Sequence, residues 1–187
     1  MRTLLVALLA IVPATVCGQT SDSVTPRPVA PVVVGGACPF ECCRYGAWTL
    51  STPAEVRARP SSKAPRLARL TRGSAVNADS GIVIVTRLGV VVVRRPYRDP
   101  AMNVHYVPGD TLVLLDYLGE GFWNEWSRGR TQQVSESWDR APGGDAQLLV
   151  EQESEWWALV TWRDATREHR GWIDMRNVGV DGADACA

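Results

Sequence analysis

The sequence predicts an all-β fold from three observations. Short runs of β-branched and aromatic residues recur along the chain, glycine and proline separate them, and no long run keeps the 3.6-residue period of a helix. The chain has 187 residues, 45% of them hydrophobic, which is enough to pack a core in one domain or in two very small ones. We therefore expect a small barrel or sandwich of short strands.

The first 18 residues have the pattern of a secretory signal peptide. Met1-Arg2 gives a positive start, and the apolar run that follows ends at Pro13, which is too short to cross a bilayer. Cleavage is expected after Gly18, and a lipid anchor at Cys17 is the minor alternative. No later segment has transmembrane length. The sequence thus predicts export to the periplasm or the outside of a bacterial cell.

Export determines how the cysteines are interpreted. It leaves four of them in an oxidising compartment, an even number that favours disulfides. A metal site would need reduced thiols and usually Cys-x-x-Cys spacing, so no metal is expected. Because a bond between neighbouring cysteines is strained, Cys42 and Cys43 are expected to pair outward, one with Cys38 and the other with Cys186.

The strands are predicted from apolar runs bounded by turn residues. The runs 82–85 and 90–93 flank a four-residue loop and predict a hairpin. The uniformly apolar run 90–93 should be buried on both faces, or else be an open edge for docking. Arg130–Asp145 is expected to be irregular. The remaining strands are expected at 111–117, 122–126, 147–150, 156–162 and 170–175.

Two blocks of the chain resemble a known family. Val56-Arg57-Ala58-Arg59-Pro60-Ser61-Ser62 resembles the opening of bacterial SH3-type (SH3b) domains, where it begins the first strand and a long loop. Trp156-Trp157-Ala158-Leu159-Val160, followed by Gly171-Trp172-Ile173, is similar to the closing pattern of that family. The resemblance covers roughly residues 49–76 and 156–175.

The resemblance implies SH3-like small barrels stapled by disulfides. An ordinary SH3b domain has about 60–70 residues, whereas roughly 80 residues separate the two blocks. Either one barrel is enlarged by a β insertion or two SH3-like halves follow each other. The second interpretation gives a signal peptide 1–18, a Pro/Gly-rich linker 19–37, a Cys-rich cap 38–48, a first half 49–105 and a second half 106–187 with a C-terminal Cys tail.

The same resemblance implies a binding module that is not an enzyme and needs no cofactor. SH3b domains commonly recognise cell-wall peptides or other envelope proteins. The expected ligand is accordingly a cell-wall peptide or glycopeptide, or an envelope protein. Nucleic acid is not expected, because the 20 basic and 20 acidic residues cancel.

Aromatic side chains supply the candidate ligand site. Tryptophan binds sugar faces and peptide side chains well because it brings a large area with little rotamer entropy to lose. In the stretch 117–123, two glycines form a turn that presents an acid between aromatic residues, which suits an amine-bearing ligand such as a diamino-acid cross-link. Strand alternation places Trp156 and Trp157 on opposite faces of the same strand, so one of them should be partly exposed. The candidate residues are Tyr117, Glu120, Trp123, Trp126 and Trp156.

Three alternatives remain open at this stage. Glu120 is alternatively a solvated side chain in a plain hairpin turn, and any single tryptophan is alternatively a core residue. The protein is alternatively a structural one that docks another envelope protein through the valine run or the cap. A cell-wall hydrolase would use two of Asp116, Glu120 and Glu125, but it needs two acids at a fixed separation, one with a raised pKa.

Overall fold

The computed structural model describes residues 24–136 and 143–186 and confirms the all-β class. The strand pairing throughout is antiparallel, and one 3-10 turn, Met175–Asn177, precedes the last strand. Within these ranges no helix is both long enough and apolar enough to cross a bilayer. The expected signal peptide and lipid anchor fall outside the described residues.

The first sheet collects strands from the two ends of the described chain. Strand β1 pairs with one end of β5, on the side of β5 away from β13. Among the described strands, the two terminal strands of the sheet are paired on one side only, so this sheet is not the closed barrel that was expected. Its order is β15 (Val180–Asp181), β2 (Gly46–Leu50), β5 (Ala75–Arg87), β13 (Glu153–Arg163), β14 (Glu168–Asp174), β3 (Ala54–Arg57) and β4 (Arg66–Leu70), with β1 at Val32–Gly35.

The second sheet is formed by the middle of the chain. A two-stranded ribbon of β7 (Tyr97–Arg98) and β8 (His105–Tyr106) accompanies it. Its order is β11 (Arg130–Ser135), β10 (Phe122–Ser127), β9 (Thr111–Gly119), β6 (Gly89–Val93) and β12 (Ala146–Val150).

This topology corrects two expectations about the middle of the chain and decides between the two alternatives for the valine run. The predicted hairpin of 82–85 with 90–93 is wrong, because β5 pairs with β13 and β1 whereas β6 pairs with β9 and β12. The valine run is an inner strand in which Val91 and Val93 are buried and Val90 and Val92 are partly buried, so the alternative of an open docking edge is wrong. The segment expected to be irregular begins with a regular strand, β11.

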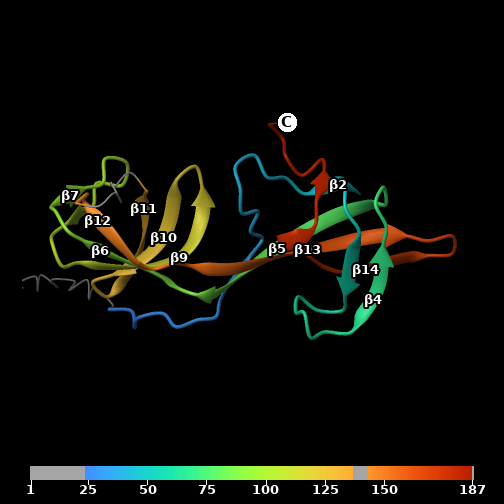
Figure 1. Ribbon diagram of the computed structural model, residues 1–187, viewed down its shortest axis with the longest axis horizontal. Helices are drawn as coiled ribbons and strands as arrows, with labels where there is room; N and C mark the ends of the chain where they lie inside the picture. Colours follow the sequence, from blue (N-terminus) through green and yellow to red (C-terminus); the bar gives the residue numbers. More distant parts are fainter. Residues whose placement is uncertain (1–23, 137–142, 187) are drawn as a thin grey trace, which may run out of the picture.

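The second sheet is an insertion between β5 and β13. Figure 1 shows these two long strands, green and orange, running from one lobe of the molecule toward the other. They pair from Arg87 opposite Glu153 to Asn77 opposite Thr161. The sheets therefore divide the chain differently from the boundary expected between residues 105 and 106, because residues on both sides of that boundary belong to each sheet.

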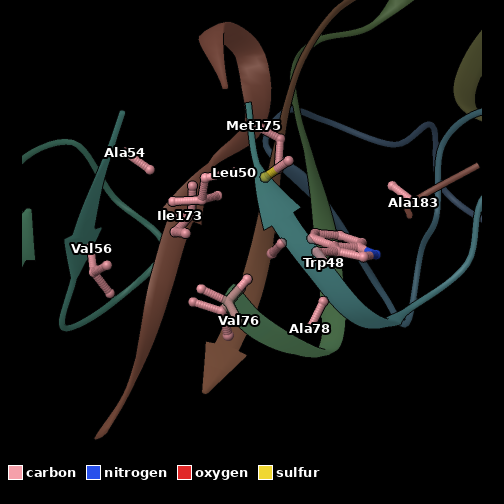
Figure 2. Close-up of a cluster of buried hydrophobic side chains, with 11 residues drawn as sticks. Trp48, Leu50, Ala54, Val56, Val76, Ala78, Ile173, Met175 and Ala183 are labelled. Carbon is pink, nitrogen blue, oxygen red and sulfur yellow. The ribbon is translucent and has the colours of Figure 1, made fainter. Parts of the chain in front are cut away.

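Each sheet buries its own apolar cluster. In the first sheet, Trp157 is buried and Trp156 is partly exposed, on opposite faces of β13, as alternation predicted. The second cluster consists of Val91, Val93, Tyr106, Leu112, Leu114, Val134 and Ala146. The first, drawn in Figure 2, consists of Trp48, Leu50, Ala54, Val56, Val76, Ala78, Ala158, Val160, Ile173, Met175 and Ala183.

The N-terminal segment is attached to both sheets and is not a free linker. The Thr25 amide donates to the carbonyl of Gly129 at 2.6 Å in the turn between β10 and β11, and β1 extends the first sheet. In Figure 1 this blue segment passes from the second sheet to the first. It leads directly into the Cys-rich cap, which begins at Cys38.

Two disulfides hold the cap. Cys38 is bonded to Cys43 and Cys42 to Cys186, with Cα–Cα distances of 5.5 and 5.6 Å. The neighbouring cysteines therefore pair outward. The second bond connects residues 144 positions apart and joins the cap to the C-terminal end of the described chain.

Candidate functional site

Two separate cavities, which share no lining residue, lie where the cap meets the β9–β10 hairpin, and we call this pair of cavities the junction groove. The first has a volume of about 390 Å³ and the second about 350 Å³, both within the range of small-molecule sites. The first is lined by Pro39, Val83, Tyr117, Trp123, Glu136 and Ser154, among others. The second is lined by Phe40, Glu41, Leu118, Glu120, Phe122 and Gln133, among others.

Tyr117 and Trp123 form the aromatic wall of the first cavity. They are cross-strand partners in β9 and β10, and their ring centroids are 5.1 Å apart at an interplanar angle of 56°. The indole N–H of Trp123 donates to Glu136 at 2.6 Å, and the Tyr117 hydroxyl accepts from the amide of Gly121 at 2.9 Å. The polar ends of both rings are thus held by the protein, and both rings line the cavity.

Glu120 lies at the tip of the same hairpin and lines the second cavity. The pairing of Gly119 with Phe122 leaves Glu120 and Gly121 as a two-residue turn, with φ of 52° and 76°. Positive φ at both positions is the type I′ geometry, whose twist matches that of the flanking strands. The Glu120 side chain is exposed and makes no hydrogen bond or ion pair with any described residue.

The cap supplies the opposite side of the groove. Its two disulfides fix the short loop that carries Phe40 and Glu41. Phe40 packs edge-on against Trp156 with ring centroids 5.7 Å apart. The loop is thereby held against β13 on one side while its other side faces the hairpin.

The groove is acidic. Three carboxylates line the two cavities, those of Glu41, Glu120 and Glu136, and none of the described residues that line them is basic. An aromatic wall beside carboxylates attracts cations through both the ring quadrupole and direct charge. The arrangement is therefore chemically suited to an amine-bearing or guanidinium-bearing ligand.

Of the residues predicted for the site, Trp126 and Trp156 lie outside the groove lining. The Trp126 indole donates to the carbonyl of Thr25 at 3.2 Å, because Trp126 is three residues beyond Trp123 and so points to the other face of β10. Trp156 lies under Phe40 and packs against Trp48. Tyr117, Glu120 and Trp123 line the groove.

The three carboxylates considered for a hydrolase do not meet in one cavity. Glu125 is fully buried and accepts a hydrogen bond at 3.1 Å from Tyr106, which lies in the β7–β8 ribbon. Asp116 is also buried and accepts from Asn124. Burial raises the pKa of both carboxyls. Glu120 alone of the three lines the groove.

Sequence reasoning missed the residues that the cap and β11 bring to the groove. Phe40 and Glu41 lie about 80 positions from the hairpin they face, and no local pattern links them. Glu136 follows β11, where the sequence predicted irregular structure. The one usable signal was the cysteine spacing, which predicted a fixed cap.

Comparison of the chain with models of protein families, with curated proteins and with solved structures found no match.

Proposed function

We propose that the protein is an exported, non-catalytic binding module that holds a cell-wall peptide or glycopeptide in the junction groove. One observation carries the proposal. The aromatic pair Tyr117 and Trp123 lines one cavity of the groove together with Glu136, while Glu41 and Glu120 line the other, and none of the described residues that line either cavity is basic. The rings contact a sugar or an apolar side chain, and Glu120 contacts the free amine of a diamino acid.

The SH3b-like resemblance supports a binding role. The two resembling blocks, 49–76 and 156–175, contribute β3, β4 and β14, the start of β5 and most of β13 to the same sheet. On this proposal the protein is one SH3-like unit enlarged by the second sheet. The groove then lies where the enlargement meets the cap.

Export is supported by the disulfides. Two bonds that join all four cysteines of residues 38–186 persist in an oxidising compartment and would be reduced in a cytosol. The apolar N-terminal run of the sequence is the second support.

Co-sedimentation of the mature protein with isolated peptidoglycan tests the binding proposal. Trp123→Ala removes half of the aromatic wall, and we expect at least a tenfold loss of the bound fraction, equivalent to about 1.4 kcal/mol. Trp162→Ala is the matched control, since Trp162 stacks on His169 in the first sheet, 5.2 Å between centroids, and lines neither cavity of the groove. Equal losses in both variants would contradict the proposal.

The same experiment separates the alternatives. Release of soluble wall fragments by the wild type would indicate a hydrolase. Complete absence of co-sedimentation would favour docking of an envelope protein, for which the exposed Phe40 and Leu118 on the two sides of the second cavity are the available apolar contacts.

A further inference from the structure

The β3–β4 hairpin carries an unusual concentration of positive charge. Residues 54–72 contain six basic side chains and one acidic side chain, in a chain whose formal net charge is zero. The hairpin belongs to the first sheet and lies on the side of the molecule away from the second (Figure 1). It shares no residue with the junction groove.

Most of these cations have no counter-charge. Glu55 is shared by Arg57, at 2.5 Å, and Arg66, at 3.0 Å. The other four side chains are exposed and make no ion pair or hydrogen bond with any residue in the described ranges. These four are Arg59, Lys63, Arg69 and Arg72.

The hairpin also ends in an open sheet edge. Strand β4 is the last strand of the first sheet, and β3 is its only neighbour among the described strands. Half of the backbone N–H and C=O groups of such a strand point outward and can pair with another chain. A register shift opposite Val56 and Arg57 leaves Leu67 outside the pairing, and this apolar side chain is 52% exposed between Arg66 and Ala68.

Charge decides what this edge can accept. A basic edge repels a second basic strand, which protects the protein from pairing with its own copies through this edge. The same charges attract a strand of opposite sign, because complementary potentials steer association and fix the register. An acidic extended segment with intervening apolar residues matches the cations, the free backbone groups and Leu67 together.

We propose that β4 is a docking edge for an acidic, extended polypeptide segment of a partner protein. The segment adds one strand to the first sheet by backbone hydrogen bonds along Arg66–Leu70, the β-augmentation mode. Its carboxylates contact the unpaired cations around the hairpin, and an apolar side chain covers Leu67. This surface is independent of the junction groove and adds a second partner to the proposed function.

Fluorescence anisotropy with three labelled peptides tests the proposal on the whole mature protein. The probe alternates Glu and Val, the second peptide replaces each Glu by Gln, and the third is the Glu-Val peptide with alternate amides methylated. We expect the probe to bind at least tenfold more tightly than either of the other two peptides. The Gln peptide lacks charge, and the methylated peptide lacks the amide N–H groups that would donate to β4. Equal binding of the methylated peptide would overturn strand addition. It would indicate that the hairpin is a general anion-binding surface, which would also bind anionic lipid.

Charge reversal localises the site. Arg69→Glu should weaken probe binding at least tenfold, while Arg163→Glu, a matched reversal at a highly exposed position of the same sheet, should leave it within about twofold. Trp123→Ala should leave probe binding unchanged, so failure of the groove and failure of the edge are distinguishable. Equal effects of the two reversals, or no binding of the probe to the wild type, would overturn the proposal.

Discussion

Glu125 is a buried carboxyl whose two oxygens differ in hydrogen bonding. Its Oε1 accepts from Tyr106 at 3.1 Å, from Ser127 at 3.0 Å and from Gln132 at 2.7 Å. Its Oε2 is buried without a hydrogen-bond partner. A charged carboxylate is poorly solvated there, so burial raises the pKa of Glu125, although the three donors partly oppose this. Burial also raises the pKa of Tyr106, and the nearby Glu125 charge adds to that shift.

Glu125 is therefore expected to make the protein less stable as pH rises. When the folded-state pKa of an acid exceeds its unfolded value, the folded state holds the proton longer. The unfolding free energy then falls between the unfolded and folded pKa values, by about 1.4 kcal/mol for each unit of pKa elevation. Glu125→Gln should make the decrease of the unfolding free energy with pH smaller. Urea unfolding at a series of pH values from about 4 to about 8, where a carboxyl with a raised pKa titrates, measures this. Parallel wild-type and variant curves would contradict the assignment.

The two-residue turn of the β9–β10 hairpin places a glutamate where its backbone is strained. Positive φ costs a residue with a Cβ roughly 1 kcal/mol, and type I′ turns favour Asn-Gly for that reason. Glu120 has φ of 52° and precedes Gly121, so Glu occupies the position that Asn fits best. Strain retained at a groove residue is consistent with a role for its carboxylate.

Glu120→Asn should separate stability from binding. We expect the unfolding free energy to rise by about 0.5–1 kcal/mol, because Asn tolerates positive φ, while binding of peptidoglycan falls with loss of the charge. Thermal unfolding and co-sedimentation on the same preparation measure the two effects. An unchanged bound fraction would remove Glu120 from the site.

At the same scale, strand positions were more predictable than strand partners. The runs 82–85 and 90–93 both form strands, yet the four-residue loop between them does not close a hairpin. Both runs are apolar on two faces and can be buried against several neighbours. Their partners, β13 and β9, are chosen by burial over the whole sheet, which no local turn signal specifies.

The long-range disulfide should contribute most to the stability of the whole molecule. Cys42–Cys186 closes a loop of 144 positions, and Cys38–Cys43 closes one of 5. In the chain-entropy model these bonds stabilise by about 5 and about 2 kcal/mol. We expect the double substitution Cys42→Ser, Cys186→Ser to lower the unfolding free energy by about two and a half times as much as Cys38→Ser, Cys43→Ser, measured by denaturant unfolding. Equal losses would contradict the loop-length argument.

The charges of the whole molecule are unevenly distributed, although its net charge is zero. The equal numbers of acidic and basic residues argued against a nucleic-acid partner. In the fold, however, six cations gather on the β3–β4 hairpin while carboxylates line the junction groove. Composition sums charges over the chain, whereas recognition depends on where the chain brings them together.

The sequence by itself determined the β class, the position of most strands, the outward pairing of the adjacent cysteines and the hairpin that carries Tyr117, Glu120 and Trp123. Each of these depends on residues close together in the chain, through alternation, turn chemistry or the geometry of neighbouring cysteines. Tertiary structure alone decided that the second sheet is inserted between β5 and β13, that Phe40 and Glu41 face the hairpin, and that Glu125 is buried. These outcomes depend on which apolar faces cover one another, a choice made over the entire chain.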